Sequence, residues 1–355
     1  MSEQRVKVGV VGASGYSGEE LLNILLRHPH VELTVVTSRQ YAGQQVGEVF
    51  PRFSHYPGTA GLTFCDPDPE KFGAQAECFF LALPHGVAHE YAKSLVGQGK
   101  RIIDLSADFR LDDPAIYNEF YGHEHPCPEL LSQSVYGLPE IHGPSIREAQ
   151  LIASPGCYPT SILVPLMPLV EQSVIRPDSI IADSLSGVSG AGRNASLPYL
   201  YVECNESLRP YGVPKHRHLA EIEQELSKAA ERQITIQFTP HLVPVNRGIL
   251  TTIYAAPASE IRSTESMEAF NQRLESIYQE YYGECPFVRL LGTGALPDTK
   301  NVTGTNVIEF GWRLDPRTGR LIVMSAEDNL IKGAGGQAVQ SMNLIYGFRE
   351  TDGLI

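Results

Sequence analysis

The first forty residues alternate between apolar runs and a segment rich in glycine. Residues 6–11 are almost wholly apolar, which is typical of a buried parallel strand. The segment 12–18, Gly-Ala-Ser-Gly-Tyr-Ser-Gly, follows directly. A leucine-rich run with acidic residues at its start then predicts a helix that ends near residues 28–29. Residues 31–36 have the pattern of a second strand, so the sequence predicts a βαβ unit with a glycine-rich first turn.

Strands and helices continue to alternate further along the first half of the chain. Residues 78–83 and 102–105 have the pattern of buried strands, and residues 87–96 between them have a helical pattern. Strands that alternate with helices predict a doubly wound parallel sheet. Residues 111–147, which are rich in Pro, Tyr, Glu and His, are expected to form a connecting region.

The second half of the chain, from residue 151, has fewer helices for each strand. Strand-like runs recur at 179–183, 234–239, 249–256, 302–310 and 320–325. Helices are predicted at about 219–231, 266–282 and 333–346. This pattern predicts an α+β domain with a large mixed sheet, so the expected fold class is α/β with two different domains.

Length and composition limit the classes of function. The chain has 355 residues, more than twice an ordinary domain of about 150, so two domains are expected. Lys and Arg number 28 against 41 Asp and Glu, a net charge of −13. This balance argues against a nucleic-acid binder but leaves small anionic ligands open, because a site needs only local positive potential.

Membrane spans, secretion and bound metals are not expected. The sequence has no apolar run of 18 residues and no apolar signal segment after its first residues, so a cytoplasmic protein is expected. Its six cysteines include no Cys-x-x-Cys pair. The cysteines therefore match neither a zinc pattern nor a dense disulfide framework.

The glycine-rich segment is a candidate dinucleotide site. Glycines there let the backbone turn tightly and approach a pyrophosphate, while the helix N–H groups point at the anion. The spacing of Gly12, Gly15 and Gly18 is not the commoner G-x-G-x-x-G, but its place between strand and helix favours this site over a plain tight turn. Ser38 and Arg39 follow the second strand, where an NAD site would have a carboxylate. NADP is therefore expected, with a solvated surface arginine as the alternative for Arg39.

Cys157 is the strongest candidate nucleophile. It lies in Ser-Pro-Gly-Cys-Tyr-Pro-Thr, residues 154–160, at the start of an apolar stretch with a helical pattern. A helix N-terminus stabilises a thiolate. Pro165 and Pro168 predict that this helix is kinked or short. On spacing alone, a buried structural cysteine fits equally well.

Two histidines are candidates for the general base. His218 precedes the helix predicted at 219–231 and shares a face with Ile222, so we expect it to point inward. His216 lies two positions earlier and is expected to project elsewhere. A histidine at a helix N-terminus is kept neutral, as a general base must be. A capping or surface histidine is the alternative.

The segment 183–193, Asp-Ser-Leu-Ser-Gly-Val-Ser-Gly-Ala-Gly-Arg, is a candidate anion site. Its hydroxyl and N–H groups and its arginine can bind a phosphate or a carboxylate. A flexible Gly/Ser loop is the alternative. Arg110, in the segment 104–110 at the end of a predicted strand, can bind an anionic substrate as well.

Together these motifs resemble the N-acetyl-γ-glutamyl-phosphate reductase family, within the aspartate-semialdehyde dehydrogenase-like superfamily. The cysteine segment 154–160 and the segment 186–193 are the most specific parts of the resemblance. The other matching segments, which span nearly the whole chain in order, are 12–18, 83–86, 104–110, 136–140, 216–218 and 328–336.

The resemblance implies a Rossmann NADP-binding domain at 1–150 plus 330–355, and a catalytic and oligomerisation domain at 151–329, in a homodimer or homotetramer. It also implies a step of arginine biosynthesis, the NADPH-dependent reductive dephosphorylation of N-acetyl-γ-glutamyl phosphate to N-acetylglutamate 5-semialdehyde. Cys157 would form a thioester, and His218, or as second choice His216, would move the proton.

By the same resemblance and the arguments above, further residues are assigned to the two ligands. The expected cofactor-binding residues are Gly12, Ser14, Gly15, Tyr16, Ser17, Gly18, Ser38, Arg39, Pro84, Asn329 and Gly333. The expected substrate-binding residues are Arg110, Ser184, Ser186, Gly187, Ser189, Gly190 and Arg193. A reductase of aspartyl or N-acetyl-aminoadipyl phosphate is the alternative in the same class, and a non-catalytic NADP sensor or a thiol hydrolase is the alternative outside it.

Overall fold

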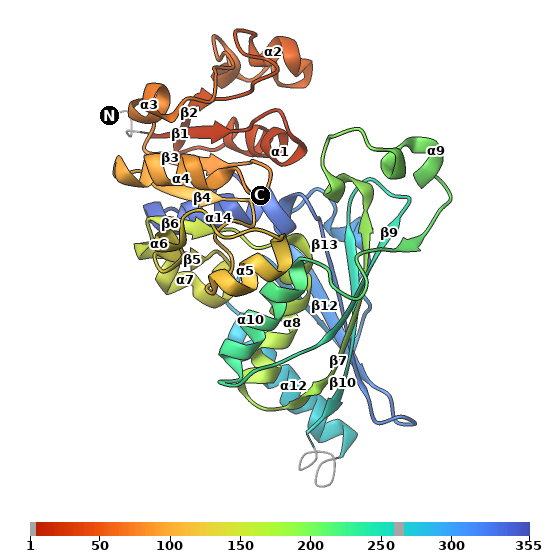
Figure 1. Ribbon diagram of the computed structural model, residues 1–355. Helices are drawn as coiled ribbons and strands as arrows, with labels where there is room; N and C mark the ends of the chain where they lie inside the picture. Colours follow the sequence, from red (N-terminus) through yellow and green to blue (C-terminus); the bar gives the residue numbers. More distant parts are fainter. Residues whose placement is uncertain (1–4, 259–265) are drawn as a thin grey trace. The chain divides into compact units, whose positions relative to one another are not determined.

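The computed structural model describes residues 5–258 and 266–355, and the chain forms two compact units (Figure 1). The first unit runs up to Pro155 and also includes Ala334–Ile355, and the second unit is Gly156–Gly333. None of the helices among the described residues combines the length and the hydropathy that crossing a membrane requires.

The first unit contains a six-stranded parallel sheet in the order β2-β1-β3-β4-β6-β5. Its strands are β1 (Val6–Val11), β2 (Val31–Val36), β3 (Cys78–Leu81), β4 (Arg101–Asp104), β5 (Ser134–Tyr136) and β6 (Leu151–Ala153). The chain winds outward in both directions from β1, so a topological switch point lies between β1 and β3. Ligands of doubly wound sheets bind at the carboxyl ends of the strands at this point.

Helices cover both faces of this sheet. They are α1 (Tyr16–Leu25), α2 (Val46–Val49), α3 (Pro69–Phe72), α4 (Ala88–Gly97), α5 (Pro114–Tyr121), α6 (Pro128–Leu131), α7 (Pro139–Glu148) and α14 (Gly336–Tyr346). Two apolar clusters lie between the sheet and these helices, and β1 contributes Val8 and Val10 to one cluster and Val11 to the other. Strand β1 is therefore apolar along its length because both of its faces are buried.

Two parts of the first unit differ from the sequence-based expectation. Residues 111–147 are not an irregular connection, because they contain α5, α6, β5 and α7. Each of these helices has a proline at its first position, where the missing N–H costs nothing, so prolines that indicated a loop are in fact helix starts. Strand β6 also extends the sheet past residue 150 by pairing in parallel with β4.

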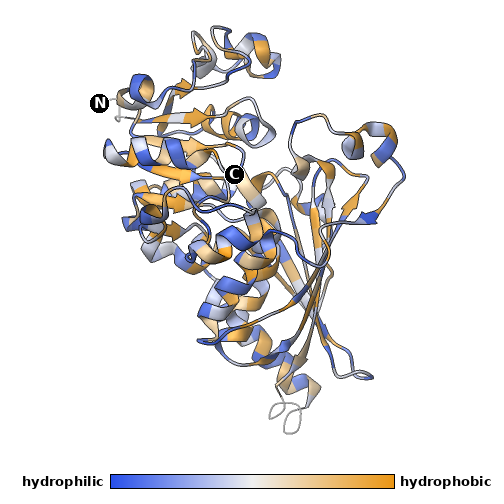
Figure 2. Ribbon diagram, in the orientation of Figure 1, coloured by the Kyte–Doolittle hydropathy of each residue, from blue (hydrophilic) through white to orange (hydrophobic). Residues whose placement is uncertain are grey.

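The second unit contains a mixed seven-stranded sheet in the order β11-β12-β13-β10-β7-β9-β8. Its strands are β7 (Ile175–Gly187), β8 (Arg209–Pro210), β9 (Gln237–Val243), β10 (Ile249–Pro257), β11 (Val288–Gly292), β12 (Ile308–Leu314) and β13 (Leu321–Glu327). The strand predicted at 302–310 begins only at Ile308, because α13 (Thr299–Val302) precedes it. The strands of both sheets carry stretches of hydrophobic residues (Figure 2), and the expected fold class is confirmed.

One face of this sheet is covered by α8 (Cys157–Glu171), which contacts β7, β10 and β13, and α8 in turn contacts α10 (His218–Ala229) and α12 (Met267–Tyr282) (Figure 1). Residues alternate along β10, so that Ile249, Thr251 and Ile253 are buried while Leu250 and Tyr254 are only half-buried. The second face of the sheet is therefore partly open within this unit.

Helix α8 is a single helix of 15 residues, so of the two expected outcomes, a kinked or a short helix, the short helix is wrong. A proline within a helix removes the N–H that would donate to the carbonyl four residues earlier. Pro165 thereby leaves the Ser161 carbonyl without its helical donor, and Ser325 Oγ donates to that oxygen at 2.6 Å. Pro168 does the same to Val164, whose carbonyl accepts from the Tyr282 hydroxyl at 2.7 Å. Side chains from other elements thus replace the missing helical bonds.

We expect Ser325→Ala to lower the free energy of unfolding by about 1–3 kcal/mol, because the buried Ser161 carbonyl loses its donor. In a Pro165→Ala background the cost should fall below about 1 kcal/mol, since the substituted residue supplies a backbone N–H to the same oxygen. Urea unfolding followed by fluorescence of Trp312, the one tryptophan of the chain, measures both values. Equal costs in the two backgrounds would show that the Ser161 carbonyl is not the relevant partner.

Candidate functional site

The glycine-rich loop of the first unit joins β1 to α1 at the switch point. Gly12 has a φ of +83°, and a methyl group there would lie 2.4 Å from the Ala82 carbonyl oxygen. A methyl group at Gly18 would lie 2.5 Å from the Gly12 oxygen, whereas Gly15 has more room. No side chain caps the N-terminus of α1. A tight backbone turn that leads into an uncapped helix start fits the pyrophosphate of a dinucleotide.

Hydroxyl groups connect this loop to the end of β2. The Gly12 N–H donates to Thr37 Oγ1 at 3.0 Å, and the hydroxyls of Ser14 and Ser38 lie 2.9 Å apart. Ser38 is buried, whereas the next residue, Arg39, is exposed. Between Gly15 and Gly18 of the loop, Tyr16 is exposed and Ser17 is half-buried. Hydrogen bonds therefore join the glycine-rich loop to the residues that follow β2, and the exposed cation Arg39 lies next to the point where they meet.

The loop that follows β3 lies across the switch point and contains Pro84, which is exposed. The buried Asp108 carboxylate holds this loop, because it accepts the Gly86 N–H at 2.7 Å and the His89 N–H at 3.2 Å. Burial, and then the charge of Asp108, raises the pKa of the Asp104 carboxyl. Asp108 lies in the segment 104–110 that carries the family resemblance, but the sequence did not indicate that its carboxylate holds the loop after β3.

Arg110 is almost fully buried in the first unit, with 5% of its surface exposed. Its Nε donates to the Ser154 carbonyl and its Nη2 to the Leu105 carbonyl, both at 2.8 Å. These oxygens follow strands β6 and β4 respectively. The guanidinium thus ties together the carboxyl ends of two neighbouring strands, of which β6 leads along the chain to Cys157.

Cys157 is the first residue of α8 in the second unit. The preceding residue, Gly156, donates its N–H to Glu221 Oε1 at 2.8 Å. A methyl group at Gly156 would lie 2.5 Å from His218 Nε2, so the imidazole of His218 lies directly against this glycine. His218 is itself the first residue of α10, one position earlier than the sequence predicted the helix boundary.

His216 lies in an aromatic cluster. Its ring makes edge contacts with Tyr158, Tyr211 and Phe238 at centroid distances of 5.4–5.6 Å. Its Nδ1 accepts the His218 N–H at 3.1 Å. Burial, assisted by the charge of Arg217, lowers the pKa of His216 to about 4, so the ring is neutral near pH 7.

Gly333 packs against the other side of Cys157. A methyl group at Gly333 would lie 2.8 Å from Cys157 Cβ and 3.0 Å from Glu327 Oε1. Asn329 lies in the same turn after β13, where its Oδ1 accepts the Gly248 N–H and its Nδ2 donates to Ser189 Oγ, both at 2.9 Å. The structure thus brings Asn329, which the sequence assigned to the cofactor, together with Ser189, which it assigned to the substrate.

The residues predicted to bind substrate in the segment 184–193 do not share one environment. Ser184 is fully buried, and its hydroxyl lies 2.8 Å from Thr251 Oγ1, which contacts Ser161 of α8 in turn. Ser186 is nearly buried, and Gly187 packs against the backbone of residues 246–247. Gly190 and Arg193 are exposed. Ser184 therefore contacts α8 through the hydroxyl of Thr251, whereas the later residues form a loop at the end of β7.

Sequence reasoning missed two features of this site. Glu221 is a buried carboxylate three residues after His218. This i+3 spacing places both side chains on one helix face, and it could have identified Glu221 from the sequence. The hydroxyls of Tyr158 and Tyr211 lie 2.8 Å apart, and burial raises the pKa of both, so both stay protonated. No sequence signal connects these two tyrosines, which are 53 positions apart.

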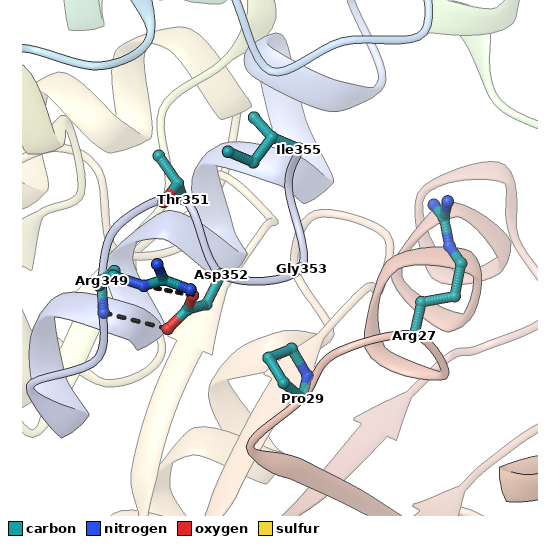
Figure 3. A pocket seen from close by; sticks show the side chains of 7 residues that line it. All are labelled: Arg27, Pro29, Arg349, Thr351, Asp352, Gly353 and Ile355. Carbon is teal, nitrogen blue, oxygen red and sulfur yellow. Dashed lines mark hydrogen bonds and ion pairs between the residues drawn. The ribbon is translucent and has the colours of Figure 1, made fainter.

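Elsewhere in the first unit, a pocket is lined by Arg27, Pro29, Arg349, Thr351, Asp352, Gly353 and Ile355, with Arg349 bonded to Asp352 (Figure 3). It contains none of the predicted site residues. In the part of the chain that the structure describes, no three His, Cys, Asp or Glu side chains are grouped so that they could hold a metal ion.

Comparison with protein families gives two matches. Residues 7–149 match the semialdehyde dehydrogenase NAD binding domain, and residues 157–329 match the semialdehyde dehydrogenase dimerisation domain. Among solved structures, aspartate semialdehyde dehydrogenase II complexed with ASA from Vibrio cholerae has a TM-score of 0.72 at 18% identity, covering 97% of this chain and 99% of that chain. Aspartate semialdehyde dehydrogenase with NADP from Candida albicans has a TM-score of 0.68, also at 18% identity, with the same coverage. These structures show a shared fold.

Curated relatives are much closer in sequence. The N-acetyl-gamma-glutamyl-phosphate reductase of Akkermansia muciniphila is 57% identical over 352 residues, 99% of each chain. That of Geobacter metallireducens is 51% identical over 351 residues, 98% of each chain. With both family domains matched and identity of this level from end to end, the chain belongs to the N-acetyl-gamma-glutamyl-phosphate reductase family of the semialdehyde dehydrogenases.

Proposed function

We propose that the chain catalyses the NADPH-dependent reductive dephosphorylation of N-acetyl-γ-glutamyl phosphate to N-acetylglutamate 5-semialdehyde, in arginine biosynthesis. One observation carries the proposal: Cys157 begins α8, and the His218 imidazole lies against the glycine that precedes it. A thiol at a helix start with an imidazole beside it is the arrangement of an activated nucleophile. The names of relatives at 51–57% identity support this substrate.

In the first half of the reaction, His218 accepts the Cys157 thiol proton and the thiolate attacks the acyl carbon of the substrate. A thioester forms, the bond from that carbon to the phosphate oxygen breaks, and phosphate leaves with the bonding electron pair. The positive end of the α8 dipole stabilises both the thiolate and the oxyanion that develops on the attacked carbonyl. Glu221 positions this turn through the Gly156 N–H.

In the second half, a nicotinamide bound at the glycine-rich loop would supply the hydride for reduction of the thioester. The carbon–sulfur bond then breaks, the aldehyde leaves, and His218 returns its proton to the Cys157 thiolate. The loop Gly12–Gly18 fits the pyrophosphate, with Ser14, Tyr16 and Ser17 at its edge. Pro84, in the loop after β3 at the same switch point, and Asn329 and Gly333, in the turn after β13, complete the proposed cofactor set.

Substrate recognition is assigned to the loop at the end of β7 and to Arg110. Ser186 and Ser189 provide hydroxyls, Gly190 an N–H group and Arg193 a guanidinium for the anionic groups of the substrate. Gly187 shapes this loop, because its own N–H donates to the Gly248 carbonyl. Ser184 acts through Thr251, because its own hydroxyl is buried. Reduction of aspartyl or N-acetyl-aminoadipyl phosphate is the competing function.

NADP, rather than NAD, is the proposed cofactor, because Arg39 and Ser38 lie at the end of β2 where a 2′-phosphate would bind. The proposed assembly is a cytoplasmic homodimer or homotetramer formed through the open face of the second unit's sheet. Ile181, Tyr254 and Ile322 lie in one row across three paired strands on this face, and none of them is buried. An apolar row of this kind is typical of a surface that another subunit covers.

The reverse reaction tests the function and the nucleophile together. With N-acetylglutamate semialdehyde, phosphate and NADP, we expect phosphate-dependent formation of NADPH that Cys157→Ser reduces at least about 1000-fold. NADP affinity should be unchanged, and Cys285→Ser, at a half-buried cysteine of the same unit, should stay close to wild type. No phosphate-dependent signal, with activity on aspartate semialdehyde instead, would overturn the proposed substrate.

The pH profile distinguishes the two histidines. Since the pKa of His216 is about 4, lowering the pH from 8 to 5 leaves this ring neutral, so His216 does not cause an acid limb in that range. We expect His216→Gln to keep that limb of kcat/KM in place, and His218→Gln to lower kcat/KM about 100-fold or more and to abolish the limb. The proposed role of His218 is wrong if the limb disappears in His216→Gln and survives in His218→Gln.

Arg39→Ser tests the choice of dinucleotide. Loss of a guanidinium that binds a phosphate should lower kcat/KM for NADPH about 10- to 100-fold while leaving the value for NADH unchanged. Arg52→Ser is the matched control, because Arg52 is an exposed arginine of the same unit paired with Glu19. Equal losses with both cofactors would contradict the assignment of Arg39.

A further inference from the structure

The loop 244–248 joins β9 to β10 and is bonded on two sides. On one side, the N–H groups of Gly187, Val188 and Ser189 donate to carbonyls of residues 248, 245 and 246 at 2.9–3.2 Å. On the other side, the Gly248 N–H donates to Asn329 Oδ1. This loop therefore holds the end of β7, to which substrate binding is assigned, in a fixed position against the turn after β13.

Arg247 is the one cation of this loop. Its Nη1 lies 3.6 Å from Asp328 Oδ2, and 27% of its side chain is exposed, whereas Asp328 is fully buried. The Asp328 carboxylate already accepts N–H groups from Gly304, Leu330 and Ile331 at 2.8–3.1 Å. Because 3.6 Å exceeds a good hydrogen bond, Asp328 attracts the guanidinium mainly by charge.

A short path leads from this ion pair to Cys157. The Asp328 carbonyl accepts the Gly333 N–H at 2.9 Å, and Gly333 packs against Cys157 Cβ. Two carboxylates lie in the same neighbourhood, since Glu221 accepts the Gly156 N–H and Glu327 contacts Gly333. A substrate with a carboxylate and a phosphoryl group would be repelled there unless a cation also faces it.

We propose that Arg247 binds an anionic group of the substrate, either its carboxylate or its phosphoryl group; this inference rests on the proposed function. Arginine suits both groups because its planar guanidinium donates two parallel hydrogen bonds to paired oxygens. Arg110 in the first unit already donates hydrogen bonds from Nε and Nη2 to backbone carbonyls, and Arg193 lies on an exposed loop. Arg247 is partly exposed and held in place by Asp328, so it presents an oriented cation.

The test measures KM values in the reverse reaction for Arg247→Gln and Arg247→Lys. We expect Arg247→Gln to raise the KM of the semialdehyde or of phosphate roughly 10- to 100-fold, and the one that rises identifies the group that is bound. The KM of NADP should not change, and Arg247→Lys should be intermediate. Arg289→Gln is the matched control, because Arg289 also pairs with a buried carboxylate of this unit, Glu309, at 3.1 Å.

The proposal is overturned if both KM values stay within about twofold of wild type, or if Arg289→Gln raises them equally. A fall in melting temperature and kcat without a change in KM would also overturn it, because a purely structural partner of Asp328 would have that signature. A failure of the proposed function looks different, since wild-type protein would then show no phosphate-dependent activity at all.

Discussion

The second unit depends on close backbone packing at the start of α8. Gly156 leaves room for the His218 ring, and Gly333 leaves room for Cys157 itself, so a methyl group at either position would overlap its neighbour. These two contacts bring α10 and the turn after β13 to the same residue. Glu221 completes the arrangement by accepting the Gly156 N–H, which ties the first turn of α8 to α10. Three elements, α8, α10 and the turn after β13, therefore pack closely around the backbone of residues 156–157.

The same helix shows how buried polar groups determine the neighbours that an element needs. Pro165 and Pro168 leave two carbonyls of α8 without helical donors, and a buried carbonyl without a donor is costly. Ser325 of β13 and Tyr282 of α12 supply those donors. The prolines therefore fix which elements pack around α8, and through them the position of the turn that carries Asp328, Asn329 and Gly333.

The first unit uses carboxylates and hydroxyls in a comparable way. Asp108 accepts two backbone N–H groups of the loop after β3, and the hydroxyls of Thr37 and Ser38 contact the loop after β1. Both loops lie at the switch point of the sheet. Their backbones are held by side chains from neighbouring loops, so the surface offered to a dinucleotide is preorganised before the ligand arrives.

Local periodicity along the chain was enough to predict several parts of the fold. The apolar run before Gly12, the glycine spacing and the alternating strands and helices predicted the parallel sheet and its glycine-rich first turn, and the motif around Cys157 placed that residue at a helix start. The family resemblance supplied the expected return of the C-terminal helix. Prolines misled the prediction at 111–147 and the alternative of a short α8, because their local signal does not distinguish a helix start or a satisfied helix interior from a break.

Only the tertiary structure decided the neighbours of the site. The sequence ranked His218 before His216 as the base, but it did not show that His216 is desolvated among aromatic rings or that His218 lies against Gly156. Ser184 looks like a donor in a polar loop, but it is buried beneath α8. Glu221 in the second unit and Asp108 in the first each hold a backbone segment through hydrogen bonds outside their own element. Burial and long-range pairing set the charge state and access of these groups, and neither can be obtained from local spacing.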